Sequence, residues 1–230
     1  MNERLRLLTA NLANGRADAR AFAELVETLA PDAVAVQELS PEQAEALAQV
    51  LPHGALAPAR DHTGMGVALR HPGAIRRVPL PYRDAHVAEV AVGAPEPVEL
   101  VNVHLLAPHA RPPWWTLRVR RGQVRGLEAY LDATPRRHRV VLGDLNATAL
   151  WPAYRRLAAR LADGAVEAAR HNGHRVQPTW GPGARTPRLL RIDHVLVSGL
   201  SVEGFRVVAI RGSDHSAVVA DVSVAAPPAP

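Results

Sequence analysis

The chain is built mainly from short apolar runs of the kind that form buried β-strands, separated by turn residues and by a few stretches of helical periodicity. Many runs follow one another without an intervening helix, so the sheets are expected to be mixed or antiparallel. Two runs flank a turn at Pro72 and Gly73, and a Gly/Pro-rich loop is expected to close a hairpin between 85–92 and 98–104. The predicted strands cover residues 4–10, 33–38, 65–69, 74–79, 85–92, 98–104, 139–142, 191–198, 202–210 and 217–224.

Four stretches repeat apolar residues at the helical period. The second begins at Pro41, directly after Ser40, whose hydroxyl suits an N-cap because it can accept a hydrogen bond from the first turn. The third carries an apolar stripe that is expected to face the core, formed by Leu117, Val124, Leu127 and Leu131. The predicted helices cover residues 17–30, 41–50, 116–131 and 153–161.

No Gly/Ser-rich linker divides the chain, which predicts one α/β domain over residues 1–225 and a frayed tail over residues 226–230. Strands outnumber long helices. The layer arrangement that best covers their apolar faces is two packed β-sheets with helices on the outer sides.

Composition narrows the class of protein. Hydrophobic residues make up 47% of the 230 residues and charged residues 21%, which suits a globular core and argues against general disorder. Cysteine is absent, and this excludes a disulfide scaffold, a cysteine-ligated metal site and thiol catalysis. The net charge is +5 with arginine as the only strongly basic residue type, which permits phosphate-bearing partners without selecting one.

No apolar run is long enough to cross a bilayer, and no signal peptide precedes the first strand-like run. A cytoplasmic location is therefore the default expectation. A secreted or membrane-tethered location is expected instead if an upstream segment has been trimmed.

Polar residues recur where apolar strands end. Alternation places Asn11 on one face with Leu5 and Leu7, and Glu38 on one face with Val34 and Val36. The same pattern ends later strands in polar groups, with Asn102 and His104 after one run and Asp144 and Asn146 after another. If these strand ends lie together at one edge of the sheets, their side chains form a polar cluster that is held by rigid strands.

Two later segments add ionisable groups. Asp193 begins an apolar strand and shares its face with Val195 and Val197, an unusual setting for an unpaired carboxylate. Asp214 and His215 lie in a turn just before the last strand. A catalytic histidine needs a carboxylate to set its tautomer, so a contact between Asp193 and His215 is predicted.

Carboxylates and amides without cysteine suit a hard cation such as magnesium. Glu38 is the first candidate ligand, with Asn11 and Asp214 near it. Asp144 and Asn146 are candidates for a second ion or for positioning the attacking water, and His104 or His215 for donating to a phosphate oxygen. The set fits hydrolysis of a phosphoester.

Each piece also has a simpler structural explanation. Asn11 can form a turn, Glu38 can end a strand in solvent, and Asp144 with Asn146 can form an Asx turn. His104 can be a satisfied core histidine. The joint occurrence of these residues, in order and at strand ends, is what favours a functional site.

The ordered set resembles the endonuclease/exonuclease/phosphatase superfamily, with its DNase I-like fold. The resemblance implies a four-layer α/β sandwich, two packed mixed β-sheets flanked by helices, and Mg²⁺- or Mn²⁺-dependent hydrolysis of a phosphoester by water. The matching segments span nearly the whole domain: LTANL around Asn11, VQE ending at Glu38, NVHL around His104, GDLN at 143–146, PTW ending at Trp180, RIDHVLVS around Asp193, and residues 213–215.

Carried over residue by residue, the resemblance implies Glu38 as the main metal ligand, supported by Asn11, with Asp214 as a further metal-site carboxylate. It implies Asp144 beside Asn146 as the group that positions or activates water. His215, oriented by Asp193, is implied to contact the phosphate. His104 lies where repair enzymes of the superfamily carry tyrosine, and is more similar to the DNase and sphingomyelinase branches.

The substrate remains open at this point. Arginine and tryptophan are interleaved from Arg111 through Trp115 to Arg121, which suits stacking on nucleic acid and equally a lipid interface, whereas the alternative is that the tryptophans simply pack. With Arg111, Trp115 and Trp180 as candidate substrate contacts, three functions are considered. The first is a nuclease acting on DNA or RNA, the second a phosphodiesterase or phosphatase acting on a phospholipid or small phosphorylated molecule, and the third a non-catalytic binding protein. The nuclease, as a monomer without a protein partner, is the preferred hypothesis.

Overall fold

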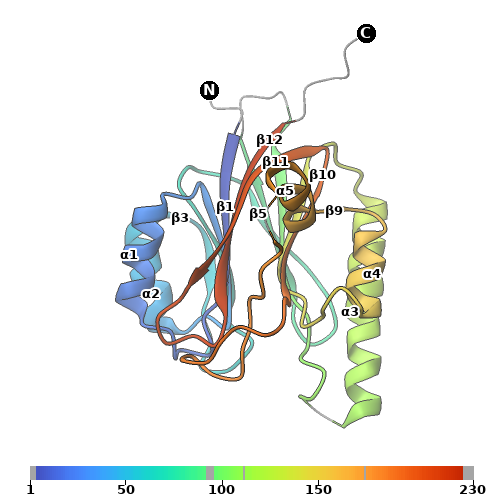
Figure 1. Cartoon of the computed structure of the whole chain (residues 1–230), viewed down its shortest axis with the longest axis horizontal. Coiled ribbons are helices and arrows are strands. Elements are labelled where there is room, and N and C mark those ends of the chain that lie inside the picture. The colour runs from blue at the N-terminus through green and yellow to red at the C-terminus, as the bar shows by residue number, and fades with distance from the viewer. Residues whose placement is uncertain (1–3, 92–95, 111, 174, 225–230) are drawn as a thin grey trace.

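The computed structural model of the chain describes residues 4–91, 96–110, 112–173 and 175–224. Twelve strands in this part of the chain form two six-stranded sheets, which lie face to face (Figure 1). Both sheets contain parallel and antiparallel pairs, so both are mixed. The predicted fold class is confirmed, and the predicted tail at 226–230 lies outside the described residues.

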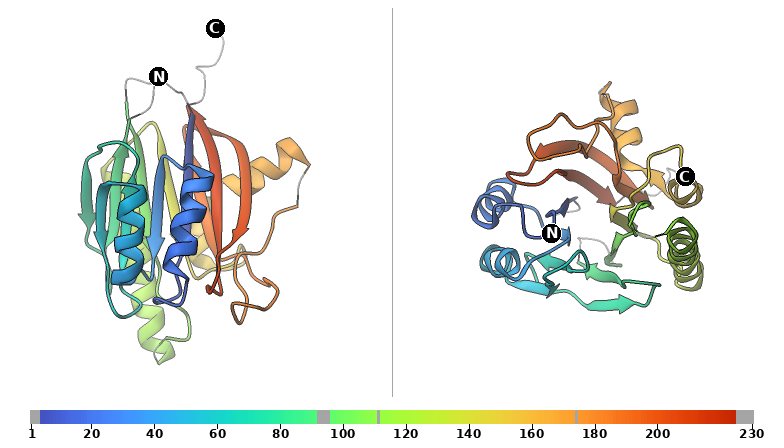
Figure 2. Two further views of the ribbon diagram at one scale, coloured as in Figure 1. Left: turned by 90° about the vertical axis from the view of Figure 1, so that its left-hand side faces the viewer. Right: turned by 90° about the horizontal axis from the view of Figure 1, so that it is seen from below.

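The first sheet has the order β11-β12-β1-β2-β4-β3. The last two strands therefore return to pair beside the first strand of the chain, as Figure 2 shows for the red and dark blue strands. Its strands are β1 (Arg4–Asn11), β2 (Ala33–Gln37), β3 (His53–Ala57), β4 (Met65–Leu69), β11 (Leu200–Ala209) and β12 (Ser216–Val224).

The second sheet has the order β5-β6-β7-β8-β10-β9. The predicted hairpin is present as the antiparallel pair β6 and β7, whereas the turn at Pro72 and Gly73 leads from the first sheet to the second instead of pairing its two flanking strands. The strands are β5 (Ile75–Val78), β6 (Ala85–Val90), β7 (Val98–His104), β8 (Arg139–Asp144), β9 (Ala162–Asp163) and β10 (Asp193–Ser198).

Helices cover the outer faces of both sheets and complete four layers (Figures 1 and 2). One apolar cluster fills the space between the sheets, a second joins α1 and α2 to the first sheet, and a third joins α3 and α4 to the second sheet. The helices are α1 (Ala19–Leu29), α2 (Pro41–Val50), α3 (Pro113–Ala133), α4 (Pro152–Ala158) and α5 (Gly164–Asn172). No helix in the described ranges is long and apolar enough to span a membrane.

Local sequence signals explain the helix starts. Ser40 caps α2 in a capping box, because its side chain accepts from the backbone of Gln43 while the Gln43 side chain accepts from the backbone of Ser40. Asp18 caps α1 by accepting from the backbone of Ala21, and Asp163 caps α5 in the same way. The predicted cap at Ser40 is therefore confirmed.

Two expectations need correction. Of the four apolar residues predicted to face the core from α3, Val124, Leu127 and Leu131 are buried. Leu117 is 52% exposed, because α3 extends past the sheet that this apolar face covers. The pattern also missed β3, β9 and α5. These elements are short and lie at the edge of the sandwich, and β3 is built largely from glycine and alanine, so their apolar periodicity is weak.

The buried histidine of β6 predicts acid sensitivity. The pKa of His86 is lowered to about 4, because burial disfavours the charged ring and Arg77 adds a nearby positive charge. Since the unfolded chain titrates near 6.5, the stabilisation from neutral His86 is complete above that pH and is lost as the pH falls from 6.5 toward 4.

When the pH falls from about 7 to about 4.5, the free energy of unfolding should decrease in both proteins. We predict that the decrease is about 2 kcal/mol smaller in H86Q than in the unsubstituted protein. Urea denaturation at the two pH values measures the difference. H71Q, at an exposed histidine, is the matched control and should behave like the unsubstituted protein. An equal loss in H86Q and the unsubstituted protein would contradict the prediction.

Candidate active site

Strand register brings the polar strand ends to one place. In the second sheet, β8 lies between β7 and β10, and Asp144 at its end pairs directly with His104 on one side and Asp193 on the other. In the first sheet, Asn11 ends β1 and pairs with Gln37 at the end of β2, directly before Glu38. The strand-end residues of the two sheets face each other across the sandwich, as the prediction of one polar cluster requires.

The Asp144 carboxylate is buried and bound from both sheets. Its Oδ2 accepts hydrogen bonds from Nδ2 of Asn11, at 3.0 Å, and from Nδ2 of Asn146, at 3.1 Å. Its Oδ1 accepts from the backbone nitrogen of Asn146 at 2.7 Å, which closes a tight turn. The two predicted asparagines therefore hold the carboxylate in one orientation.

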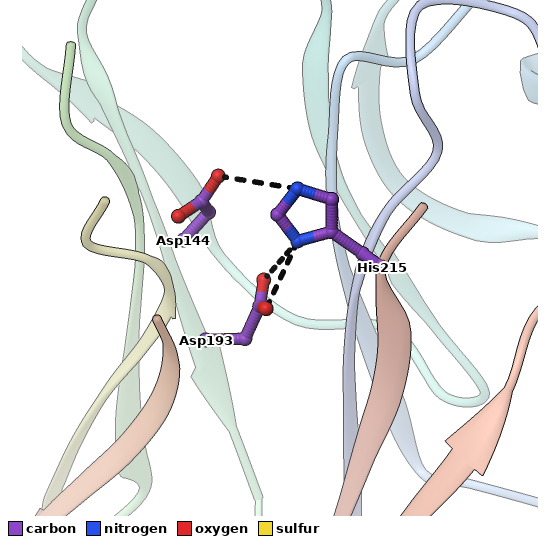
Figure 3. A group of neighbouring side chains, drawn as sticks. All are labelled: Asp144, Asp193 and His215. Atoms are coloured by element: carbon purple, nitrogen blue, oxygen red, sulfur yellow. Dashed lines mark hydrogen bonds and ion pairs between the residues drawn. The ribbon is translucent and has the colours of Figure 1, made fainter. Parts of the chain in front are cut away.

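Asp193 and His215 form the predicted pair (Figure 3). His215 Nδ1 lies 2.9 Å from Asp193 Oδ2 and 3.1 Å from Oδ1, and the Thr179 hydroxyl donates to the same Oδ2 at 2.6 Å. This arrangement directs His215 Nε2 toward Asp144 Oδ2, 3.9 Å away. The turn before β12 is held by Ser213, whose hydroxyl donates to the Asn11 carbonyl and accepts from the His215 backbone.

Burial and neighbouring charges set the protonation states. The pKa of Asp144 is raised to about 7, because burial disfavours its charged form and the Asp193 carboxylate repels it. The pKa of His215 is raised to about 9: burial lowers it, but the attraction and hydrogen bond of Asp193 outweigh burial, and Asp144 adds to them. At neutral pH His215 is therefore an imidazolium directed into the site.

His104 is a neutral imidazole. Burial is the main cause that lowers its pKa well below 6.5, and the charge of Arg83 adds to it. Nη1 of Arg83 contacts His104 Nδ1, so Nδ1 is the acceptor and Nε2 carries the proton. Nε2 in turn faces Asp144 Oδ2 at 3.6 Å and Glu38 Oε1 at 3.8 Å.

Glu38 lies on the open side of the cluster. Its Oε2 is 3.0 Å from His62 Nδ1, on the exposed loop before β4, and its Oε1 faces His104. The carboxylate adds to the repulsion that raises the pKa of Asp144 and is attracted to the buried Arg83. Glu38 therefore belongs to the same electrostatic cluster as Asp144.

The backbone around the site is strained or sterically constrained. Glu38 and Asn146 both adopt left-handed backbone angles, with φ of 54° and 45°, which cost free energy in residues other than glycine and concentrate at functional sites. Gly143 has φ of 132°, and a Cβ there would lie 2.0 Å from the Val103 carbonyl oxygen. Only glycine allows β7 and β8 to approach this closely beside Asp144.

Arg83 and His62 are site residues that the strand-end pattern missed. Arg83 is buried, and its Nε has no hydrogen-bond partner among the described residues. The signal was available in the predicted hairpin, because pairing His86 with Asn102 brings the residues just before β6 beside His104. Arg83 precedes β6 and interrupts no apolar run, so the strand pattern did not mark it.

Other predicted residues lie outside the cluster or beyond the described chain. The Asp214 carboxylate forms an ion pair with Arg16 at 3.1 Å, and its contact with the site is a long-range attraction to His215. Trp115 is half-buried and packs edge-on against Tyr82, with ring centroids 6.0 Å apart. Trp180 bridges the backbones of Leu190 and His215. Arg111 lies outside the described residues.

The donor set fits a hard divalent ion. Asp144, Asp193 and His215 offer ligand atoms within 4.8 Å of one another, and Glu38 adds a carboxylate that is only 15% exposed. Buried carboxylates that repel one another are stabilised when a cation is bound, and their oxygens are the ligands that Mg²⁺ and Mn²⁺ prefer. His215 already pairs with Asp193, so the carboxylates are the better ligands.

Comparison with known proteins identifies the family of this chain. The family model for the Endonuclease/Exonuclease/phosphatase family matches residues 8–215, from β1 to His215. The chain belongs to the endonuclease/exonuclease/phosphatase family. This family consists of hydrolytic phosphoesterases that generally use divalent metal ions. A search of curated proteins returns no match.

Solved structures share the fold of this endonuclease/exonuclease/phosphatase family chain. A family member from Beutenbergia cavernae is 23% identical, with a TM-score of 0.73 over 98% of this chain and 73% of that one. A member from Bacteroides vulgatus is 18% identical, with a TM-score of 0.71 over 96% and 99% of the two chains. A humanized D. rerio TDP2 with 14 mutations is 16% identical, with a TM-score of 0.73 over 96% and 100%.

The pairing at the centre of the site predicts a titration. We expect Asp193→Asn to lower the pKa of His215 from about 9 toward the ordinary imidazole range, because Asp193 is the largest cause that raises it. NMR titration of the histidine ring measures the change. Asp214→Asn is the matched control and should shift the pKa less, since Asp214 is the smallest of the named contributors. Equal shifts in the two variants would refute the pairing.

Proposed function

We propose that the protein is a divalent-metal-dependent phosphodiesterase, and that its substrate is a nucleic acid. The observation that carries the proposal is the convergence of Asp144, Asp193 and His215 with Asn11 and Glu38 in one partly buried cluster fed by both sheets. Family membership supports phosphoester hydrolysis. The metal, the nucleic acid and the roles of single residues are our proposal.

Glu38 and Asn11 are the proposed ligands of the ion, with Asp144 on its inner side. Asn11 donates to Asp144 through Nδ2, while its Oδ1 accepts from the backbone of Ala13 and keeps a second lone pair for a cation. A bound Mg²⁺ or Mn²⁺ supplies positive charge against a phosphate oxygen.

His215 is the proposed electrostatic stabiliser of the reacting phosphate. It is charged at neutral pH, and Asp193 occupies Nδ1, so Nε2–H is the atom left to donate to a non-bridging phosphate oxygen. Preorganised donors of this kind act strongly because they are already oriented when negative charge develops. Asp193 acts through His215 as a positioning residue.

Asp144 is the proposed base for the attacking water. Burial and the repulsion of Asp193 raise the pKa of this carboxylate, which makes it a stronger base than an exposed aspartate, and Asn146 holds it in place. The water oxygen bonds to phosphorus as the bond from phosphorus to the leaving oxygen breaks. Asp144 takes the water proton and later returns it to solvent, and solvent protonates the leaving oxygen, so the products are a phosphomonoester and an alcohol.

Arg83 and His104 add donors on the β7 side of the cluster. The buried guanidinium is attracted by both Glu38 and Asp144, and it keeps His104 in the tautomer whose Nε2–H faces those two carboxylates. The Arg83 guanidinium therefore reduces the repulsion between the Glu38 and Asp144 carboxylates, and it gives the site a fixed positive charge that can attract a phosphate.

The charge of the protein is compatible with a nucleic-acid substrate, although it does not select one by itself. The net charge is +5, all of the strongly basic residues are arginines, and nucleic acid is a polyanion that such a surface attracts along its length. A phospholipid or small phosphorylated substrate is the alternative. Exposed apolar residues near α3, among them Trp114 and Leu150, are the observation that favours a lipid.

The central prediction is that Glu38→Gln lowers Mg²⁺-dependent hydrolysis of bis-p-nitrophenyl phosphate at least 100-fold, because it removes the proposed ligand charge while keeping the shape. Hydrolysis is followed by release of p-nitrophenolate, with and without EDTA. Glu45→Gln, at an exposed position of α2, is the matched control and should retain full activity. Unchanged turnover in Glu38→Gln would remove Glu38 from the site.

A substrate panel tests the preference for nucleic acid. Plasmid DNA, single-stranded DNA, RNA and sphingomyelin vesicles are compared with the small diester under the same conditions. We expect cleavage of a nucleic acid that Glu38→Gln and EDTA both abolish. Cleavage of sphingomyelin alone would defeat the nuclease and support the lipid alternative.

A further inference from the structure

The solvent-facing side of α3 carries a row of cations headed by an aromatic ring. Trp114, Arg118, Arg121 and Arg125 lie at helical spacing on one face, and all four are exposed, Trp114 at 69%. We call these four residues the α3 stripe. The proposed function uses none of them.

Packing on the other sides fixes the direction of the stripe. Val124 and Leu127 are buried against the second sheet. On another side, Gly122 and Gly126 allow close contact with Pro81 and Leu80, which precede β6. The helix therefore cannot rotate to hide its arginines, and the stripe remains outward.

The arginines of the stripe have no ion-pair partner in the described part of the chain. The same helix shows the opposite pattern farther along, where Glu128 pairs with Arg156 and Arg160 of the α4 region, and Asp132 also pairs with Arg160. The acidic residues near the end of α3 are thus paired with arginines, whereas the three arginines of the stripe present positive charge without an ion-pair partner among the described residues.

The stripe does not stabilise its own helix. Arg118 and Arg121 are three residues apart, and Arg121 and Arg125 are four apart, so neighbouring like charges repel. An arrangement that costs helix stability suggests selection for an external anion.

The helix that carries the stripe contacts the active site through its buried face. Arg120, on the same turns of α3, is buried and donates to the carbonyl of Asn146, the residue that holds Asp144. Figures 1 and 2 show that the N-terminal half of α3 extends past the strand ends on the side where β1 finishes. The helix that carries the stripe therefore lies on the side of the molecule where the strand ends of the active site gather.

We propose that the α3 stripe binds the phosphate backbone of a single-stranded nucleic acid whose scissile phosphodiester occupies the active site. This proposal rests on the proposed function and extends it to substrate recognition. At about 1.5 Å per residue, the three arginines span about 10.5 Å along the helix, which suits several consecutive phosphates. Trp114, at the end that extends past the strands, provides a ring on which an unpaired base can stack.

A membrane is the less suitable occupant of this face. A helix that lies on a bilayer presents its apolar face to the lipid, but the apolar face of α3 is buried against the second sheet. Trp114 and Leu117 are the large apolar residues of α3 that are exposed, and both lie in its first turns. The remaining outward residues form a line of charge, which complements a linear polyanion.

The test compares two triple variants with the same change in charge. R118Q/R121Q/R125Q removes the arginines of the stripe. R4Q/R137Q/R206Q is the matched control, since all three arginines are exposed: Arg4 begins β1, Arg137 precedes β8 and Arg206 lies on β11. Binding of a fluorescein-labelled single-stranded DNA in EDTA is measured by anisotropy at several salt concentrations, and hydrolysis of bis-p-nitrophenyl phosphate is measured in Mg²⁺.

We expect the stripe variant to bind DNA at least about 10-fold more weakly. The slope of the logarithm of its binding constant against the logarithm of the salt concentration (the salt slope) should decrease in magnitude by about 2, because three phosphate contacts on a single strand are lost. Its hydrolysis of the small diester and its melting temperature should not fall. Trp114→Ala should weaken DNA binding without changing the salt slope. The control should show a smaller change in DNA binding.

Equal weakening in both triple variants would overturn the proposal in favour of general charge attraction, and unchanged binding in the stripe variant would overturn it outright. Loss of binding to phosphatidylserine vesicles with DNA binding retained would overturn it in favour of a membrane contact. A protein that binds DNA through the stripe but hydrolyses no phosphoester would refute the proposed function and leave the stripe intact.

Discussion

The burial of the Asp144 carboxylate between two sheets is the constraint on which the site depends. A carboxylate in this position costs free energy unless donors and opposite charges surround it, and no single sheet supplies enough of them. Asn11 approaches from the first sheet, and Asn146 from the turn that follows β8 in the second. The catalytic geometry is therefore a property of the sandwich as a whole, and it forms only when both sheets have packed.

A buried polar link behind the site sets how the sheets meet. Asn102 of β7 donates to the carbonyls of Val36 and Gly66 in the opposite sheet, and Gln37 donates back to the Asn102 side chain at 2.7 Å. Apolar packing alone would allow the two sheets to shift slightly relative to each other. These hydrogen bonds form in one relative position of the sheets, and leaving their groups unpaired in the interior costs free energy. The link includes Gln37, the residue directly before Glu38, and so fixes the backbone that carries the Glu38 carboxylate.

Sequence reasoning was strongest where a residue's place follows from strand alternation. It located Asn11, Glu38, His104 and Asp144 at strand ends and paired Asp193 with His215, because each is a polar group in an otherwise apolar run. It was weaker where position depends on packing between elements. Periodicity alone could not show that α3 outruns its sheet and exposes Leu117, that Arg16 engages Asp214, or that Arg83 is drawn into the interior beside His104.

We propose above all that carboxylates from both sheets share a single hard cation. Crystals grown with Mn²⁺ and recorded at a wavelength sensitive to manganese would locate the ion directly. We predict an anomalous peak within about 2.2 Å of a Glu38 oxygen, with Asp144 on the inner side of the ion. Manganese found only on exposed acidic residues, with Glu38 turned away from Asp144 and His215, would contradict it.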